Sequence, residues 1–361
     1  MGVTFRQFLR TGVSSVLHSG FLYAAVLVFG CASLGYATSY RNPVMNADFP
    51  DPSILRASDG TFYAYATQTL DHGRLYNIQV SRSKNLVEWT PPEDALPVKP
   101  KWASRTQQFW APDVKEHDGI YFMYFSAQRD HSDGLCLGVA FSKNPLGPFT
   151  DKGSPLLCGK TFENIDPMAF DDPATGKKLI YWGSGFKALR VQELAENRLE
   201  FRQGSVPVEL VAPVPLPRGL SGDDPRAYFQ LIEGSWILLH DGTYYLFFSG
   251  DNCCGERAHY GVMVARSRSA LGPFEVKKEP ILRANSRWNA PGHNSVFRDA
   301  DGVDWMFYHA IDRADPVLST PILGDRRDRR ILLMDRLVYE KGWPSFFLQS
   351  PSTTFQQGPK L

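Results

Sequence analysis

Short apolar segments rich in aromatic residues recur along the chain, and each follows a polar turn. One reads Ile-Tyr-Phe-Met-Tyr-Phe-Ser and ends at Ser126, and another reads Thr-Tyr-Tyr-Leu-Phe-Phe-Ser and ends at Ser249. Apolar runs of this length, bounded by turn residues, are typical of buried β-strands. Five related segments lie within residues 50–66, 112–126, 166–182, 232–249 and 292–308, the third being the loosest copy.

The turns before these segments indicate β-hairpins. Asp-Gly pairs stand at 59–60, 118–119, 241–242 and 301–302, and Gly adopts the positive φ of a tight hairpin turn at little steric cost. A third strand follows in several copies, and a fourth follows a Leu-Gly-Pro-Phe turn. Three to four strands recurring at roughly 50- to 70-residue intervals predict an all-β fold, a five-bladed β-propeller. We expect it to form a single domain over residues 39–361.

Residues 1–38 differ from the rest. Arg6 and Arg10 precede an apolar run over 20–34, and small residues follow it. This layout is typical of a secretory signal peptide, and we expect a secreted protein. A signal anchor is the first alternative, although the run is shorter than the about 20 residues of a bilayer span. A lipoprotein signal at Cys31 is the second, and Phe29 fits that pattern poorly.

Composition narrows the range of partners. The formal net charge is +1, which gives no electrostatic reason to expect a nucleic acid as partner. The basic run 326–330 contains Asp328 and is expected to be a solvated turn. No phosphate-cradling Gly loop is present, so no organic cofactor is expected. The four cysteines after the N-terminal segment fit two disulfides, with the pairing open and a bond between the adjacent Cys253 and Cys254 among the alternatives.

The residues that open the five copies are ionisable. They are Asp51, Asp113, Asp166, Glu233 and His293. The first strand of each propeller blade lines the axis, so we expect these side chains to converge at one end of a narrow channel. Burying several carboxylates together is costly unless they are used or compensated by a cation. With neither a Ser nor a Cys nucleophile motif, the set favours acid–base hydrolysis, as glycosidic bonds require.

At these residues the sequence resembles glycoside hydrolase family 43. The matching pieces are Phe49–Ser53, Trp110–Val114, Asn164–Pro167, Ile232–Gly234 and Gly292–Val296. The resemblance implies an inverting mechanism with Asp51 as general base, Glu233 as general acid, and Asp166 orienting Glu233 and raising its pKa. Inversion needs space for a water between the two carboxyl groups, which then lie about 6.5–9.5 Å apart.

The resemblance also implies further site residues. His293 corresponds to the residue beside a central cation, one structural Ca²⁺ held largely through water. Trp110 is expected to stack on the sugar, with packing in the blade core as its alternative. Asn164 and Ser184 match polar, substrate-binding positions of arabinan-cleaving members. Residues 249–256 replace a shorter link and leave the exact specificity open.

The expected activity is hydrolysis of arabinan-type polysaccharide, at α-1,5-L-arabinan or arabinofuranosyl linkages. The partner would be a plant cell-wall-type pentose polysaccharide or oligosaccharide. A β-xylosidase on the same framework is the nearest alternative. A non-catalytic carbohydrate-binding propeller and a retaining, fructan-cleaving propeller are the others. The sequence decides neither whether the substrate is arabinan or xylan nor whether the enzyme cleaves in endo or exo fashion.

Overall fold

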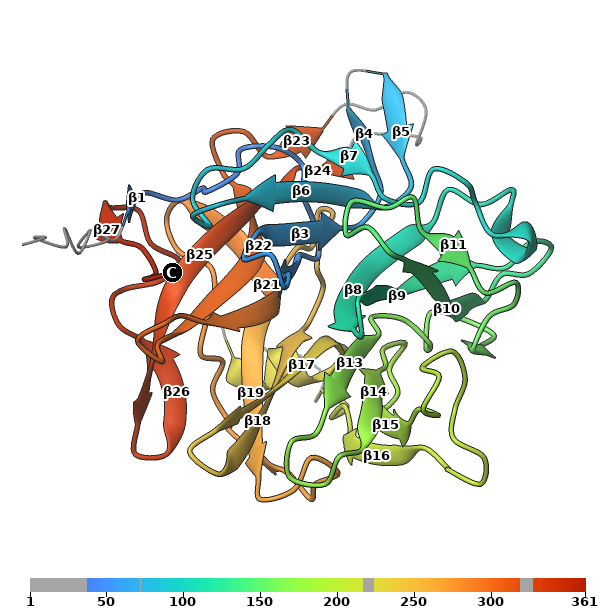
Figure 1. Ribbon diagram of the computed structural model, residues 1–361. Helices are drawn as coiled ribbons and strands as arrows, with labels where there is room; N and C mark the ends of the chain where they lie inside the picture. The colour runs from blue at the N-terminus through green and yellow to red at the C-terminus, as the bar shows by residue number, and fades with distance from the viewer. Residues whose placement is uncertain (1–37, 72, 217–223, 319–326) are drawn as a thin grey trace, which may run out of the picture. The chain divides into compact units, whose positions relative to one another are not determined.

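The computed structural model describes residues 38–71, 73–216, 224–318 and 327–361, so the predicted export segment 1–38 lies outside it except for Thr38. Within these residues, five antiparallel sheets carry most of the strands, four strands to a sheet and one extra in the second. Figure 1 shows the sheets grouped around a common centre. The first strands form a closed ring of neighbours, because β2 contacts β8, β8 contacts β13, β13 contacts β17, β17 contacts β21 and β21 contacts β2. The predicted five-bladed β-propeller is confirmed.

The blades follow the chain in order. Blade I contains β2 (Ser53–Arg56), β3 (Phe62–Ala66), β6 (Gln79–Ser83) and β7 (Glu93–Asp94). Blade II contains β8 (Phe109–His117), β9 (Ile120–Gln128), β10 (Leu135–Ser142), β11 (Thr150–Asp151) and β12 (Leu157–Cys158). Blade III contains β13 (Met168–Asp171), β14 (Lys178–Trp182), β15 (Leu189–Glu193) and β16 (Val208–Val211). Blade IV contains β17 (Ile232–His240), β18 (Thr243–Gly250), β19 (Gly261–Ser267) and β20 (Glu275–Val276). Blade V contains β21 (Trp288–Arg298), β22 (Asp304–Asp312), β25 (Arg330–Glu340) and β26 (Trp343–Phe346).

Smaller elements lie between the blade strands. Three two-stranded sheets pair β4 (Thr69–Asp71) with β5 (Arg74–Tyr76), β23 (Val317–Leu318) with β24 (Arg327–Asp328), and β1 (Ser39–Tyr40) with β27 (Gln356–Gln357). Two 3₁₀ turns are formed by η1 (Lys101–Ala103) and η2 (Pro225–Phe229). No helix among the described residues is long and apolar enough to span a membrane.

Two of the Asp-Gly hairpin turns have a positive φ at both residues, whereas at 59–60 and 301–302 only the Gly does. Asp118 and Gly119 have φ of 49° and 72°, and Asp241 and Gly242 have φ of 46° and 71°. Two consecutive positive φ values are the signature of a type I′ turn, whose twist matches that of the flanking strands. These turns place each apolar second strand directly against the first strand of its blade.

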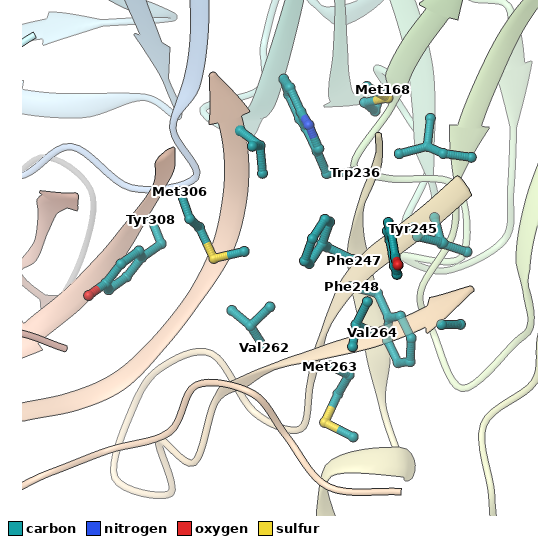
Figure 2. Close-up of a cluster of buried hydrophobic side chains, with 14 of the residues drawn as sticks. Met168, Trp236, Tyr245, Phe247, Phe248, Val262, Met263, Val264, Met306 and Tyr308 are labelled. Carbon is teal, nitrogen blue, oxygen red and sulfur yellow. The ribbon is translucent and has the colours of Figure 1, made fainter. Parts of the chain in front are cut away.

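The core lies between the blades. The largest cluster runs from Met168 of blade III through Trp236 and Phe247 of blade IV to Met306 and Tyr308 of blade V. Figure 2 shows side chains of neighbouring sheets interleaved in this cluster. Because each sheet buries both faces against neighbours, its central strand is apolar on both sides rather than alternating. This explains the continuous aromatic runs in the sequence.

The two ends of the described chain close the ring. β1 pairs with β27, and the Asn42 side chain exchanges hydrogen bonds with the Met334 backbone on β25. Asn42 also donates to Ser352 Oγ at 2.9 Å. Blades V and I are thereby joined through the segment that precedes Asp51, and one end of the axis carries the site described next.

Candidate active site

Each blade has a residue in the left-handed backbone region within its first strand or just before it. These residues are Asp51, Ala111, Asp166, Gly234 and His293, with φ of 58°, 46°, 59°, 62° and 48°. Non-Gly residues adopt such values at a cost and are held there by their surroundings. At Gly234 the requirement is also spatial, because a Cβ there would lie 3.2 Å from His293 Nδ1. The sharp bend turns the side chains at the blade starts toward the axis.

This pattern corrects the expected equivalence of the five ionisable residues. Glu233 stands one position before Gly234, and Asp113 stands two positions after Ala111. A bulge lies at the bent residue in three blades, between Trp110 and Asp113 in β8, between Glu233 and Trp236 in β17 and between Gly292 and Ser295 in β21. The ionisable residue stands at the bend in β21 but not in β8 or β17, so residue type alone misaligned the blades.

Asp113 consequently lies outside the cavity at the blade starts. It is buried and accepts hydrogen bonds from Ser53 Oγ at 2.9 Å and from the Ala169 backbone N–H at 2.8 Å. These partners belong to blades I and III, so Asp113 of blade II ties three blades together.

A repeated hydrogen bond fixes the bends. In four blades the N–H of the bent residue donates to a side chain at the end of the second strand of the preceding blade. The pairs are Ala111 with Thr67 Oγ1 (2.8 Å), Asp166 with Ser126 Oγ (2.9 Å), His293 with Ser249 Oγ (2.8 Å) and Asp51 with His309 Nδ1 (3.0 Å). Blade IV departs from the rule, because Gly234 N–H donates to Asp166 Oδ2 at 3.0 Å. The equivalent position of blade III is Gly183, which has no side chain to accept this hydrogen bond, and Ser184 one residue further on donates to Glu233.

The blade starts open into a cavity of about 840 Å³. Asp51, Asp166, Glu233, His293 and Trp110 line it together. The other lining residues include Asp48, Thr67, Gln68, Gln108, Asp133, Leu135, Lys160, Phe162, Leu231, Cys253, Cys254, Arg327, Asp328 and Arg330. Most of the residues in this lining are charged or polar, and Trp110, Leu135, Phe162 and Leu231 are among its apolar members.

Asp51 is held as a carboxylate. Its Oδ1 lies 2.9 Å from Arg330 Nη1, and its Oδ2 accepts from Thr67 Oγ1 at 2.6 Å. Burial alone would raise the pKa of Asp51, but the opposing groups, of which Arg330 is the strongest, together outweigh it and hold that pKa well below the ordinary value. Asp51 is therefore ionised over the physiological range.

His309 orients the Asp51 backbone. Burial lowers the pKa of His309 to about 4, so the ring is neutral near pH 7. Its Nδ1 accepts the Asp51 N–H, which places the ring proton on Nε2. That Nε2 is buried without a protein hydrogen-bond partner among the described residues, and a water is the natural acceptor for it.

Glu233 and Asp166 have the opposite tendency. Glu233 Oε2 accepts from Ser184 Oγ at 2.5 Å, and its Oε1 accepts from Tyr260 Oη at 2.9 Å. Burial raises the pKa of Glu233, although both hydroxyls lower it in part. Burial and then the negative charge of Glu233 raise the pKa of Asp166 well above its usual range. At least one carboxyl of this pair retains a proton where Asp51 has lost its own, which is the division that acid–base chemistry needs.

His293 lies between the two aspartates. Its Nδ1 is 3.5 Å from Asp51 Oδ1 and 3.8 Å from Asp166 Oδ2, and burial lowers its pKa. Among the described residues, no group of three or more His, Cys, Asp and Glu side chains is arranged to hold a metal directly. The next residues, Asn294 and Ser295, have buried side-chain atoms without protein partners. A neutral imidazole beside unmatched polar atoms fits a cation held mainly by water, and it does not fit one held by a protein cage.

The remaining predicted residues divide into two kinds. Trp110 lines the cavity, as stacking on a sugar would require. Ser184 is fully buried and contacts the Glu233 carboxylate, so it reaches the site through the acid. Asn164 is buried too, and its Oδ1 accepts from Trp182 Nε1 at 3.0 Å. Neither Ser184 nor Asn164 is among the residues that line the cavity.

The basic run is where the sequence-based expectation was wrong. Arg330 is not in a solvated turn, because it begins β25 with only 15% of its side chain exposed and pairs with Asp51. Arg327 and Asp328 of β24 line the same cavity. Arg329 is just as little exposed, at 14%, but it pairs with the exposed Asp315 at 3.1 Å and not with Asp51. Arg330 and Arg329 therefore differ in their partners and not in their exposure, a difference that a charge count cannot detect.

Four further site residues escaped the sequence reading: Thr67, Tyr260, His309 and Arg330. Thr67 and His309 stand directly after the buried, aromatic-rich run of their second strands, as Ser126 and Ser249 do. That shared position was the available signal.

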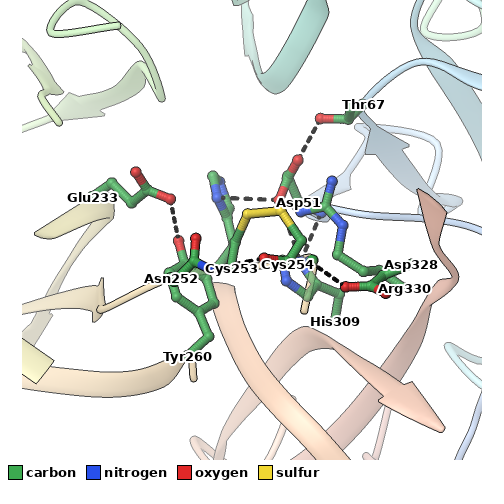
Figure 3. The surroundings of a disulfide bond; sticks show 12 residues. Asp51, Thr67, Glu233, Asn252, Cys253, Cys254, Tyr260, His309, Asp328 and Arg330 are labelled. Atoms are coloured by element: carbon green, nitrogen blue, oxygen red, sulfur yellow. Dashed lines mark hydrogen bonds and ion pairs between the residues drawn. A yellow bond between two sulfur atoms is a disulfide. The ribbon is translucent and has the colours of Figure 1, made fainter. Parts of the chain in front are cut away.

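Two disulfides are present in the described part of the chain. Cys136 pairs with Cys158, joining β10 and β12, and Cys253 pairs with Cys254. The vicinal bond lies in the residues 249–256 that were expected to shape the pocket, and both of its cysteines line the cavity. Figure 3 shows it in the midst of Glu233, Tyr260, Asp51 and Arg330.

A propeller whose axial cavity holds carboxyl groups with opposed pKa shifts has the chemistry of an acid–base glycosidase. The sequence model of the glycosyl hydrolases family 43 matches residues 40–344, and the chain belongs to this family.

Individual relatives agree with this membership. The chain is 28% identical to the extracellular exo-α-(1→5)-L-arabinofuranosidase ArbA of Cellvibrio japonicus, over 84% of this chain and 88% of that protein. It is 29% identical to the β-D-galactofuranosidase xynD of Aspergillus niger, over 84% of this chain and 83% of that protein. Among solved structures, a thermostable family-43 glycoside hydrolase superposes with a TM-score of 0.70 at 26% identity, covering 89% of this chain and 99% of the other.

Proposed function

We propose that this glycosidase hydrolyses α-1,5-L-arabinan or arabinofuranosyl linkages with inversion, using Asp51 as base and Glu233 as acid. The observation that carries the proposal is the division of charge in the cavity, with an ionised Asp51 beside Arg330 and a raised pKa at Glu233. The similarity to an arabinofuranosidase over most of both chains supports the choice of substrate.

The proposed reaction uses one water. Ionised Asp51 removes a proton from the water as its oxygen attacks the anomeric carbon. Glu233 gives its proton to the departing glycosidic oxygen, so the bond breaks without releasing an alkoxide. The two carboxyl groups exchange protonation states, and solvent restores them. Attack on the face opposite the leaving group inverts the anomeric configuration.

The neighbouring residues prepare these two states. Arg330 and Thr67 keep Asp51 ionised and aimed by contacts to its two oxygens. Ser184 and Tyr260 fix both oxygens of Glu233. Asp166 holds the Gly234 N–H next to Glu233 and repels negative charge there, which favours the protonated acid.

A calcium ion held through water at His293 forms part of the proposal. When bound, it would supply positive charge at the axis and add to stability. His293 would hold it from the channel side, and Asn294, Ser295 and His309 would hold its waters, since each has buried polar atoms without protein partners. The catalytic roles proposed for Asp51 and Glu233 do not depend on it.

Export to the extracellular space is also proposed. The relative from Cellvibrio japonicus is described as extracellular, and a disulfide-bonded propeller suits an oxidising compartment.

The test is a panel of substrates with product stereochemistry. We expect the enzyme to release arabinose or short arabino-oligosaccharides from linear α-1,5-arabinan, and ¹H NMR of the first product to show the inverted anomer. β-D-Galactofuranoside belongs in the panel because of the 29% identical relative. β-Xyloside is included because a β-xylosidase on the same fold is the alternative function. A retained anomer would contradict the inverting mechanism. Turnover of xyloside alone would contradict the choice of substrate.

A further inference from the structure

The vicinal disulfide forms part of the cavity wall. Cys253 and Cys254 line the same cavity as Asp51 and Glu233, and both side chains are only partly buried. In Figure 3 the disulfide is seen between Glu233 on one side and Asp51 with Arg330 on the other. A pair of sulfur atoms so placed faces the space where a bound sugar must lie.

The loop that carries the disulfide is anchored independently of it. Gly255 N–H donates to Asp328 Oδ2 at 2.6 Å, which ties the loop to β24 of the neighbouring blade. Asn252 Nδ2 donates to the Cys254 carbonyl at 2.9 Å, and the His259 N–H donates to the Asn252 carbonyl at 2.8 Å. His259 stacks on Tyr228 with a centroid distance of 4.3 Å. These contacts should keep the loop in place without the S–S bond.

The disulfide also has a side that faces the protein. Cys253 packs against the buried cluster of Tyr260, Ala290 and Ile311. Tyr260 is the residue that donates to Glu233. The ring therefore has one apolar side on the protein and one toward the cavity, and it could act on the acid, on the sugar, or on both.

Its chemistry favours the sugar. A disulfide has no strong hydrogen-bond donor and offers two polarisable sulfur atoms for dispersion contacts. The carboxylates and Arg330 can bind sugar hydroxyls, whereas the face of the sugar ring that carries C–H groups needs an apolar surface. The covalent ring closed by the disulfide has no side-chain rotamers to lose on binding, so its contact with the sugar costs little conformational entropy.

We propose that the Cys253–Cys254 disulfide is a binding wall that packs against the C–H face of the pentose ring held beside Glu233 and so determines affinity for the sugar. It takes no part in bond breaking. The inference rests on the proposed function, because the pentose is the substrate named there.

The test compares wild type with Cys253→Ala/Cys254→Ala. We expect KM for an α-1,5-arabino-oligosaccharide to rise on the order of 3- to 10-fold, the value of a modest lost apolar contact, with kcat changed less than about twofold and the alkaline limb of the pH–rate profile unmoved. Tyr260→Phe provides the contrast, because loss of its hydroxyl should move that limb. Thermal melting verifies that each variant is folded. An unchanged KM would overturn the inference. A fall in kcat with a shifted pH limb would also overturn it, and would indicate that the disulfide supports Tyr260 instead.

Reduction gives a second route that does not depend on refolding a variant. A phosphine reductant should raise KM of the wild type and leave that of Cys253→Ala/Cys254→Ala unchanged. The double variant is the matched control, because it retains only Cys136–Cys158 of the two described disulfides. Equal responses of the two proteins would assign the effect to Cys136–Cys158 and contradict the inference.

Equilibrium binding separates this inference from the proposed function. The same oligosaccharide is titrated into Asp51→Asn with and without the cysteine pair. Weaker oligosaccharide binding without the cysteine pair supports the disulfide as a binding wall. This holds even if the wild type hydrolyses nothing, because absence of hydrolysis would refute only the proposed function. Hydrolysis with equal KM and equal binding would refute only the wall.

Discussion

Ser184 Oγ donates to Glu233 Oε2 at 2.5 Å, so a residue of blade III holds the carboxyl group of blade IV. In the other blades a side chain one position earlier in the second strand binds a backbone N–H instead. Blade III has Gly183 at that position, and the next residue, Ser184, positions the acid.

Ser184→Ala should raise the pKa of Glu233, because the lost hydroxyl stabilised the ionised form. Since catalysis requires protonated Glu233, the alkaline limb of the pH–rate profile moves to higher pH. We expect kcat at the optimum to fall about tenfold, as the acid loses one oriented contact. Ser249→Ala is the matched control, because its hydroxyl binds only a backbone N–H. An alkaline limb that moves equally in both variants would contradict a specific role for Ser184.

Arg330→Met should move the acid limb to higher pH. Arg330 is the strongest of the groups that lower the pKa of Asp51, and the base must be ionised to act, so more alkaline conditions are needed once the cation is gone. Arg329→Met is the control, since Arg329 is as little exposed as Arg330 but pairs with Asp315 and not with Asp51. If the acid limb keeps its position in Arg330→Met, Asp51 is not the group that titrates there.

Asp166→Asn should move the alkaline limb in the opposite direction, to lower pH. The negative charge that raises the proton affinity of the Asp166–Glu233 pair is removed. Asn tolerates the positive φ at this position, and its Oδ1 can still accept the Gly234 N–H. The full pH–rate profile of the purified variant gives the answer, and an alkaline limb that rises would show that Asp166 acts on Glu233 mainly through geometry.

Calcium should raise the thermal midpoint of the protein if the axial ion is present. At a free concentration 100 times the dissociation constant, binding adds about 2.7 kcal/mol to the free energy of unfolding, which corresponds to a shift of several degrees. His293→Ala should abolish the shift, and magnesium should not reproduce it, because it requires a stricter geometry. A shift of the same size in His293→Ala would place the ion elsewhere.

The fold was predictable because its signal is local. Asp118-Gly119 and Asp241-Gly242 determine their own turns, and the aromatic strands after them read as buried. Asp51, Glu233 and His293 could be found because they open blades. Glu233 was nonetheless placed out of register, since the bent position of its blade is occupied by Gly234, which has no ionisable side chain to mark it.

The contacts between blades could not be predicted in this way. His309 reaches Asp51 across 258 positions, and Arg330 reaches it across 279. Both contacts depend on closure of blade V onto blade I, which no local pattern encodes. Arg329, the neighbour of Arg330, is just as little exposed but pairs with Asp315, so burial alone would not single out Arg330 either.

The most direct test of the central claim is sugar release from linear α-1,5-arabinan by the wild type, Asp51→Asn and Glu233→Gln, each verified as folded by thermal melting. We predict arabinose or short arabino-oligosaccharides from the wild type, and rates lower by a factor on the order of 10² to 10⁴ in both variants. Wild-type rates in either variant would contradict the assignment of the acid and base. Absence of release by the wild type on arabinan, arabinofuranosides and xylosides would instead indicate a carbohydrate-binding propeller whose carboxyl groups serve a cation.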